Sequence, residues 1–279
     1  MEAASIEQPQ RIVGHILIIM NKHKYLSVLI AIVLIFGFPL SSISKAHAER
    51  VRVYVEESSP LVDEQGNSLG IKVLQAVEEV SDLEFEFTRS TYSRALLNLK
   101  SNKADVVLHL PYEVEPGFDE YGIYLEWTVP VKADLYTLNP NNLIDISKIG
   151  NNKIGIPRGN IGFASKMTDI PQEKFYEVNT LASLVKMLAA KRVDLIWFDR
   201  VSTQQEFRNQ NIHNIYYHEI PKFGKKGSIG VGLQKTKKGL RLKKKLDHLL
   251  TQIDVESILA SYYKHLNPDL PPTGIMNLD

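Results

Sequence analysis

The chain has 279 residues, of which 44% are hydrophobic and 23% charged, a composition typical of one large folded domain or two modest ones. Its formal net charge is +1, so no global field draws it to nucleic acid or to an anionic membrane surface. It contains no cysteine, which excludes a fold held by disulfides and a zinc site built on thiolates.

The N-terminal segment has the three parts of a secretory signal. Lys22 and Lys24 form a positively charged region, and residues 26–40 form an apolar run. The small-residue sequence Ala46-His47-Ala48 then fits a cleavage site before Glu49. This order of charge, apolar run and small residues predicts export of the chain.

We therefore expect Met20 to be the start, and residues 1–48 to be an upstream extension and a signal peptide cleaved after Ala48. An uncleaved membrane anchor is the alternative, although the apolar run is short for a membrane span. The cleavage site has no cysteine, which excludes a lipoprotein. The predicted location of the mature chain is a bacterial periplasm.

After Glu49 the sequence alternates between strand and helix patterns. Short apolar or alternating runs predict strands, and longer runs with apolar residues three and four apart predict helices. The expected elements are a strand at 51–56, a helix at 70–80, a strand at 83–87, a helix at 92–103 and a strand at 104–110. Strand-helix units in this order are typical of an α/β fold with largely parallel strands.

A second block of the same design follows a polar linker at 138–152. In its helix at 180–191, Leu181, Leu184, Val185 and Leu188 follow the spacing of a helix that packs on one face. The other expected elements are strands at 153–157, 193–198 and 227–233, and helices at 158–167, 240–253 and 254–266. Two blocks of one design predict two lobes.

In open α/β sheets, ligands bind beyond the carboxyl ends of strands, where backbone groups and helix N-termini are exposed. The polar residues at the ends of four predicted strands are therefore candidates for a site: Glu56, Ser58 and Ser59; His109 to Tyr112; Arg158 to Asn160; and Asp199. Asp199 has three interpretations: a turn or helix cap, an ion-pair partner of Arg200, or a group that meets a ligand.

Other conspicuous residues have structural interpretations. His109, Trp197 and Phe198 lie in predicted buried strands, which favours a place in the core. Residues 235–245 hold seven basic residues, a run typical of a solvated helix face. A docking patch for a membrane complex is the alternative interpretation of that run.

Several stretches resemble the periplasmic solute-binding proteins of the amino-acid type (family 3). VRVYVEESSPL, GIKVLQAVEEV and YSRALLNLKSNKADVVL are similar to the first lobe, KIGIPRGNIG and LASLVKMLAAKRVDLIWFDR to the second, and GSIGVGLQKT to the strand that returns to the first. The resemblance covers nearly all of the chain after Glu49.

The resemblance implies an α/β, two-lobed type 2 periplasmic binding fold that closes on a small molecule by hinge motion. It places residues 49–132 and 230–279 in lobe 1 and residues 133–229 in lobe 2. The two expected hinge crossings lie near residues 131–134 and 228–232.

The resemblance also implies roles for single residues. Asp199 occupies the place of an acid that commonly holds a ligand amino group, and Tyr92 that of an aromatic that often stacks on the ligand. Glu56 follows the first strand, where an acid can reach polar ligand atoms. The turn that usually reads Gly-Thr or Gly-Ser, and offers N–H groups to a carboxylate, is Gly159-Asn160 in this chain.

One departure from the family pattern concerns the arginine that usually clamps the α-carboxylate after the strand ending at Leu108. The corresponding segment here, HLPYEVEPGFDEY, has four acids and neither arginine nor lysine. An ordinary α-amino acid ligand is therefore in doubt. Arg94 or Arg158 is a candidate replacement, and a surface role is the alternative for each.

The expected function is capture of a small polar solute, amino-acid-like or amine-bearing, for an ABC importer or a membrane sensor. We expect a monomer, with no cofactor, metal or nucleic acid. The sequence has no H-E-x-x-H, G-x-x-x-x-G-K or G-x-S-x-G motif. A binding-fold enzyme such as a periplasmic dehydratase is the alternative, with Glu56, Glu113 and Asp199 as its acids and bases.

Overall fold

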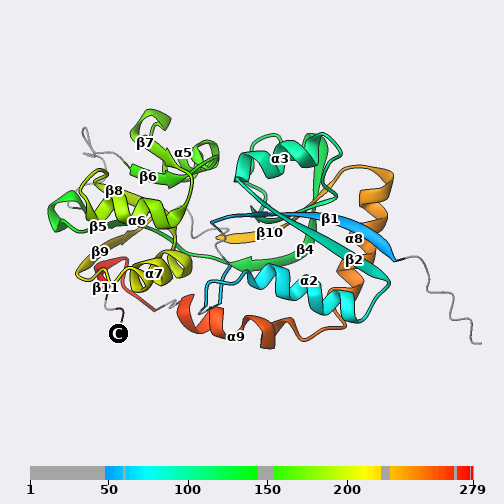
Figure 1. The fold of residues 1–279 in the computed structure, drawn as a ribbon. Coiled ribbons are helices and arrows are strands. Elements are labelled where there is room, and N and C mark those ends of the chain that lie inside the picture. Colours follow the sequence, from blue (N-terminus) through cyan, green and yellow to red (C-terminus); the bar gives the residue numbers. More distant parts are fainter. Residues whose placement is uncertain are drawn as a thin grey trace, which may run out of the picture. The chain divides into compact units, whose positions relative to one another are not determined.

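The computed structural model describes residues 48–58, 61–63, 65–143, 154–220, 227–266, 269–276 and residue 278. Residues 48–279 form one structural unit that contains two β-sheets (Figure 1). The predicted signal segment and upstream extension lie outside the described residues, except for Ala48. Among the described helices, none is long and apolar enough to cross a membrane.

The first sheet has the strand order β2-β1-β3-β10-β4. Its parallel part comprises β1 (Glu49–Glu56), β2 (Leu83–Ser90) and β3 (Val106–Pro111). The strands β10 (Ser228–Gln234) and β4 (Gly122–Pro130) complete it in antiparallel order. Alternate valines of β1 are fully buried, which fixes the face that β1 turns to the core: Val51, Val53 and Val55.

Helices cover both faces of this sheet. The helix α3 (Tyr92–Lys100) lies on one face, and α2 (Leu69–Glu79) and α9 (Val255–Leu266) lie together on the other (Figure 1). The helix α8 (Lys237–Leu250) packs against β4 and β10, and the single turn α4 (Phe118–Tyr121) precedes β4.

The second sheet has the strand order β11-β9-β5-β8-β6-β7. The strands β6 (Ile154–Pro157), β7 (Phe175–Val178) and β8 (Leu195–Asp199) are parallel. The strands β5 (Ala133–Thr137), β9 (Ile215–Glu219) and β11 (Thr273–Met276) join them through antiparallel pairs.

Three helices accompany this sheet: α5 (Ile161–Thr168), α6 (Leu181–Ala189) and α7 (Arg200–Asn209). The predicted stripe of α6 is buried in the core, which confirms its packing on one face: Leu181, Leu184, Val185 and Leu188. Two 3-10 turns, Pro140–Leu143 and Gln172–Lys174, complete the described elements.

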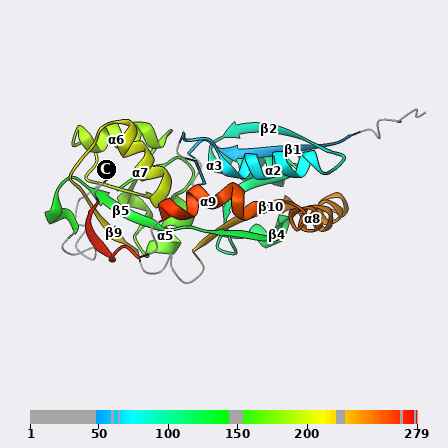
Figure 2. The same ribbon diagram turned by 90° about the horizontal axis from the view of Figure 1, so that it is seen from below.

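The chain passes between the sheets three times, whereas two passages were expected. The first is Val131 and Lys132, between β4 and β5, and the second is residues 220–227, of which 221–226 lie outside the described residues. Residues 228–232, expected at the second crossing, lie within β10. The third passage follows α9 and leads to β11 (Figure 2).

The third passage corrects the predicted lobe boundary at the C-terminus. Residues 230–279 were assigned to the first lobe, but β11 pairs with β9 in the second sheet, from Thr273 opposite His218 to Met276 opposite Ile215. A four-residue edge strand that contains a glycine carries little periodic signal, so the sequence alone does not reveal it.

A buried ion-pair network joins described residues that flank the three passages. The fully buried Arg200, the first residue of α7, donates through Nε and Nη2 to the two carboxylate oxygens of Asp134 at 2.7 and 2.8 Å. Its Nη2 also lies 3.0 Å from Glu219, which pairs with Lys132 at 2.5 Å. The fork geometry and the low exposure make these charge-assisted bonds strong.

Each passage contributes to this network. Lys132 belongs to the first passage, and its carbonyl accepts a 2.6 Å bond from the backbone N–H of Arg200. Glu219 ends β9 just before the second passage, and the carbonyl of Leu266 at the end of α9 lies 3.5 Å from Arg200 Nη1. One side chain therefore contacts the chain next to all three connections between the sheets.

Asp134→Asn should lower the free energy of unfolding by about 3–5 kcal/mol, because it removes one partner of a buried ion pair and leaves Arg200 undercompensated. Urea denaturation measures this change. The matched control is Glu84→Gln, which removes a carboxylate from the exposed Arg50–Glu84 pair and should cost less than about 1 kcal/mol. Equal, small effects of both substitutions would contradict the structural role of the network.

Candidate functional site

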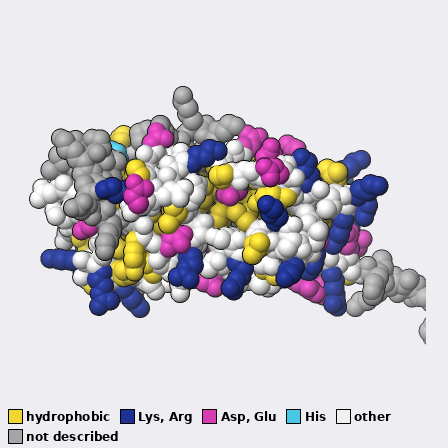
Figure 3. Space-filling view, turned by 90° about the horizontal axis from the view of Figure 1, so that it is seen from above, with side chains coloured by type: hydrophobic (Ala, Val, Ile, Leu, Met, Phe, Trp, Pro, Cys, Tyr) yellow, Lys and Arg dark blue, Asp and Glu magenta, His cyan; other side chains and the backbone are white. Residues whose placement is uncertain are grey.

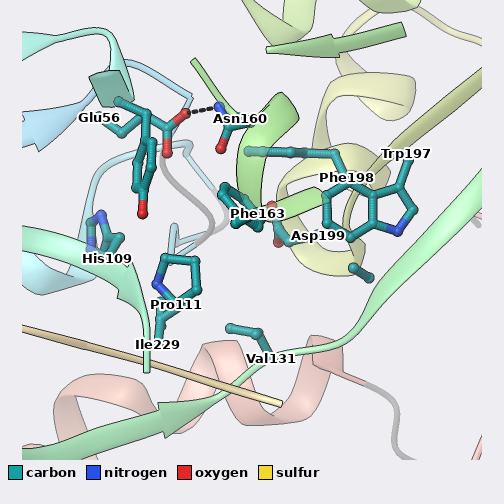
Figure 4. Close-up of a pocket in the computed structure, with 12 residues that line it drawn as sticks. Glu56, His109, Pro111, Val131, Asn160, Phe163, Trp197, Phe198, Asp199 and Ile229 are labelled. Carbon is teal, nitrogen blue, oxygen red and sulfur yellow. Dashed lines mark hydrogen bonds between the residues drawn. The ribbon is translucent and has the colours of Figure 1, made fainter. Parts of the chain in front are cut away.

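A cavity of about 30 Å³ lies between the two sheets, and residues of both sheets line it (Figure 4). Four lining residues are polar, four are aromatic and four are aliphatic: Glu56, His109, Asn160 and Asp199; Tyr92, Phe163, Trp197 and Phe198; Pro111, Val131, Ala133 and Ile229. This volume accommodates only a few water molecules. A metabolite therefore enters only if the two lobes separate or the aromatic side chains move.

Glu56 is the last residue of β1 and reaches across to the second lobe. Its Oε1 accepts a hydrogen bond of 2.8 Å from Nδ2 of Asn160, which also donates to the carbonyl of Pro157 at 3.0 Å (Figure 4). Burial raises the pKa of Glu56 to about 8 against the effect of the Asn160 bond, and the charge of Asp199 contributes to the rise. The lobes thus meet through a buried bond at the cavity wall.

Asp199 ends β8 and is the N-cap of α7, which confirms its interpretation as a helix cap. Its Oδ1 accepts a 3.0 Å bond from the backbone N–H of Ser202, and the Ser202 hydroxyl donates to Oδ2. Arg200 pairs with Asp134 and Glu219, so the interpretation of Asp199 as a partner for Arg200 is wrong. Asp199 is a cap that also lines the cavity.

Burial raises the pKa of Asp199 to about 8, despite the two bonds from Ser202. The two carboxyl groups also interact with each other and with further titratable groups around them: Glu57 and Tyr92 near Glu56, and Asp134 and Tyr262 near Asp199. Both carboxyl groups are therefore largely protonated near neutral pH. A cation that enters between them favours their ionised forms.

His109 lines the cavity because β3 contains a bulge there. The register between β3 and β10 shifts between Gly230 and Gly232, and His109 has a φ of 65°. Such a bulge turns a side chain to a new direction, often beside a binding site. Burial lowers the pKa of His109 to about 3, and the charge of Arg89 contributes, so the imidazole is neutral. The sequence gives no signal for the bulge.

Aromatic rings form one wall of the cavity and contact each other across the lobes. Tyr92, the first residue of α3, packs edge-on against Phe163 of α5 at 5.4 Å, and Phe163 contacts Trp197 at 5.8 Å. The Tyr92 hydroxyl donates to Glu115 Oε2 at 2.6 Å. Trp197 and Phe198 are buried as predicted, and they also line the cavity.

The structure brings half of the predicted site residues together. Glu56, Tyr92, Asn160 and Asp199 line the cavity, as stated above. The other four are not among the described residues that line it. Arg94 and Arg158 are exposed, and Tyr112 packs against Tyr124 at 4.9 Å. The backbone N–H of Gly159 donates to Glu177 Oε1 at 2.7 Å, so the turn expected to hold a ligand carboxylate already holds a carboxylate of the chain.

This two-lobed α/β arrangement, with a cavity between the lobes, is the fold of the type 2 periplasmic binding proteins, as predicted. No protein-family model and no curated protein sequence matches the chain. The evidence for the fold comes from solved structures.

Three similar structures illustrate the match. A histidine kinase sensor domain that resembles periplasmic binding proteins has a TM-score of 0.62 at 15% identity, covering 79% of this chain and 97% of the other. The substrate-binding protein of an amino acid ABC transporter has a TM-score of 0.63 at 12% identity, and the match covers 77% of this chain and 100% of the other. A Salmonella typhimurium periplasmic binding protein with high arginine specificity has a TM-score of 0.60 at 14% identity, and the match covers 79% of this chain and 100% of the other.

In the closed arrangement, burial of Glu56 and Asp199 should make stability fall as the pH rises from about 4 to about 8. His109 opposes this trend below its ordinary pKa of 6.5, because burial lowers its pKa to about 3. The carboxyl groups of Glu56 and Asp199 have ordinary pKa values of 4.5 and 3.8 in an unfolded chain, and burial raises both to about 8. Within that window these two groups bind more protons in the folded state than in the unfolded state, so their contribution to stability falls as the pH rises. Glu56→Gln removes one of the two titrations and keeps an oxygen that accepts from Asn160, so its stability should depend less steeply on pH.

Urea denaturation at several pH values between 5 and 8 tests this expectation. The matched control is Glu57→Gln, which changes the adjacent, exposed acid and leaves the Glu56 carboxyl in place. Identical pH slopes for the unmodified protein and Glu56→Gln would show that the Glu56 pKa is not raised.

Proposed function

We propose that the chain is a periplasmic solute-binding protein that closes its two lobes around a small polar solute. The observation that carries this proposal is the cavity itself, because each lobe supplies part of the lining and Glu56 bonds Asn160 between them. A solute that contacts both lobes favours the closed state over the open state. The similar structures, which include an ABC transporter's substrate-binding protein and a kinase sensor domain, support this role.

The partner in this proposal is an ABC permease or a membrane sensor, and the protein acts as a monomer. Export through the signal segment, with Met20 as the start and cleavage after Ala48, is part of the same proposal. Basic and acidic side chains are interspersed over the described part of the face drawn in Figure 3, which is in keeping with the net charge of +1 and gives nucleic acid no continuous basic surface there.

The decisive experiment is mass spectrometry of the protein purified under native conditions and incubated with a metabolite pool. The proposal expects one small polar compound that is bound and chemically unaltered. A compound that is consumed and converted would instead favour the dehydratase alternative, to which the paired acids Glu56 and Asp199 lend some support. If no compound is found either bound or altered, the proposed function is wrong.

Asp199→Asn should weaken binding of that compound by at least about tenfold, because asparagine cannot ionise to pair with a cationic group of the solute in a water-poor site. The melting temperature of the ligand-free protein should change little, since asparagine is also a good N-cap. Asp254→Asn is the control, because Asp254 accepts from the N–H of Ser257 in the first turn of α9 and lies outside the cavity lining. Loss of stability without loss of affinity would limit Asp199 to its capping role.

Gly159→Ala should prevent full closure of the lobes. Gly159 has a φ of 92°, and a Cβ there would overlap the hydroxyl of Ser93 and lie 2.6 Å from the Ser93 nitrogen, in the other lobe. We expect affinity for the solute to fall at least about tenfold. Small-angle scattering should then show no decrease in the radius of gyration when the solute is added.

Gly162→Ala is the matched control for this substitution. A Cβ at Gly162, three residues further along the chain, meets no described atom within 4 Å, so closure and affinity should be preserved. Normal closure of the Gly159→Ala variant would show that the contact between Gly159 and Ser93 is not part of the solute-bound state.

A further inference from the structure

We infer that the solute is a small organic ammonium compound that carries no carboxylate group. The inference rests on the proposed binding function and narrows its ligand class. It depends on three observations: the charges of the lining, the use of the nearby N–H donors, and the aromatic wall.

The first observation is that the described lining of the cavity contains two acids and no lysine or arginine. The hydrogen-bond donors that reach these acids, Asn160 for Glu56 and Ser202 for Asp199, are neutral. Arg200 follows Asp199 directly, but its guanidinium bonds Asp134 and Glu219 instead. Without a cation nearby, buried acids of this kind are neutralised by protons. The cavity is therefore complementary to a cation that comes from the solute and lets them ionise.

The second observation is that three N–H groups at turns and helix starts of the second lobe already have acceptors within the chain. Gly159 donates to Glu177 at 2.7 Å, in the turn before α5. At the start of α6, Leu181 donates to the hydroxyl of Ser58 at 3.2 Å. At the start of α7, Asp199 itself accepts from Ser202.

A solute carboxylate that took one of these three N–H groups would displace a bond within the protein, and anywhere in the cavity it would lie near two acids of like charge. Arg94 and Arg158, the candidate replacements for a clamp, are exposed and outside the cavity lining. Repulsion between a solute carboxylate and the two acids would strongly disfavour binding of that solute. The site therefore selects against the α-carboxylate of an amino acid.

The third observation separates an organic cation from a metal ion. Tyr92, Phe163, Trp197 and Phe198 line the cavity beside the acids, and aromatic faces bind alkyl ammonium groups through cation–π contacts and through apolar surface. Among the described residues, no group of three or more His, Asp or Glu side chains is placed to hold a metal ion. The lining therefore fits an ammonium group on a hydrocarbon chain.

Matched pairs of compounds that differ only in the α-carboxylate test this inference: cadaverine and lysine, putrescine and ornithine, agmatine and arginine, phenethylamine and phenylalanine. Isothermal titration calorimetry of the purified protein, freed of bound solute by reversible unfolding, measures each affinity. At least one amine should bind at least about tenfold more tightly than its amino acid. Glu56→Gln and Asp199→Asn should each weaken that amine at least about tenfold, and Asp254→Asn should not.

Two results overturn the inference. One is that amines bind but none binds at least about tenfold more tightly than its amino acid, and the other is the absence of binding by every amine in the series. Neither result overturns the proposed function, which fails only if the native protein neither carries nor captures any solute from the metabolite pool. The two experiments therefore separate a wrong ligand class from a wrong function.

Discussion

A carboxylate buried among apolar side chains is unfavourable unless a cation pairs with it, and this constraint organises the space between the two lobes. The chain meets the constraint in two ways. Where the three passages join the sheets, Asp134 and Glu219 share the guanidinium of Arg200, so the charges compensate one another within the protein. In the cavity, Glu56 and Asp199 have only neutral donors, and their pKa values are raised instead. The difference marks the cavity as the place where an external cation completes the structure.

The two regions are joined by a single peptide bond. Asp199 ends β8 and Arg200 begins α7, with no loop residue between them. Asp199 lines the cavity, while the guanidinium of Arg200 contacts the chain next to all three passages. A change in the position of Asp199 therefore moves the start of α7 and, through Arg200, the buried ion-pair network. In the proposed function, this continuity gives ligand binding and lobe closure a shared structural element.

Much of the fold could be predicted because its signal is local. Alternate valines in β1 and the leucine stripe of α6 have periods that follow directly from strand and helix geometry. The rule that ligands lie beyond strand ends correctly brought Glu56, Asn160 and Asp199 to one cavity. The features that could not be predicted depend on the register between strands that are distant in the sequence, or on the direction of a side chain. The bulge that turns His109, the return of β11 to the second sheet, and the bond from Gly159 to Glu177 arise from pairings that no local pattern encodes.

The central claim is that the cation of the solute replaces the protons of two buried carboxyl groups. Calorimetry of amine binding at pH 7, repeated in buffers with different ionisation enthalpies, counts the protons released. The account predicts release of roughly one proton or more for each amine bound, because Glu56 and Asp199 are largely protonated before binding and ionise beside the ammonium group. Release should decrease in Glu56→Gln and in Asp199→Asn. Binding with no proton release, or with proton uptake, would contradict the account.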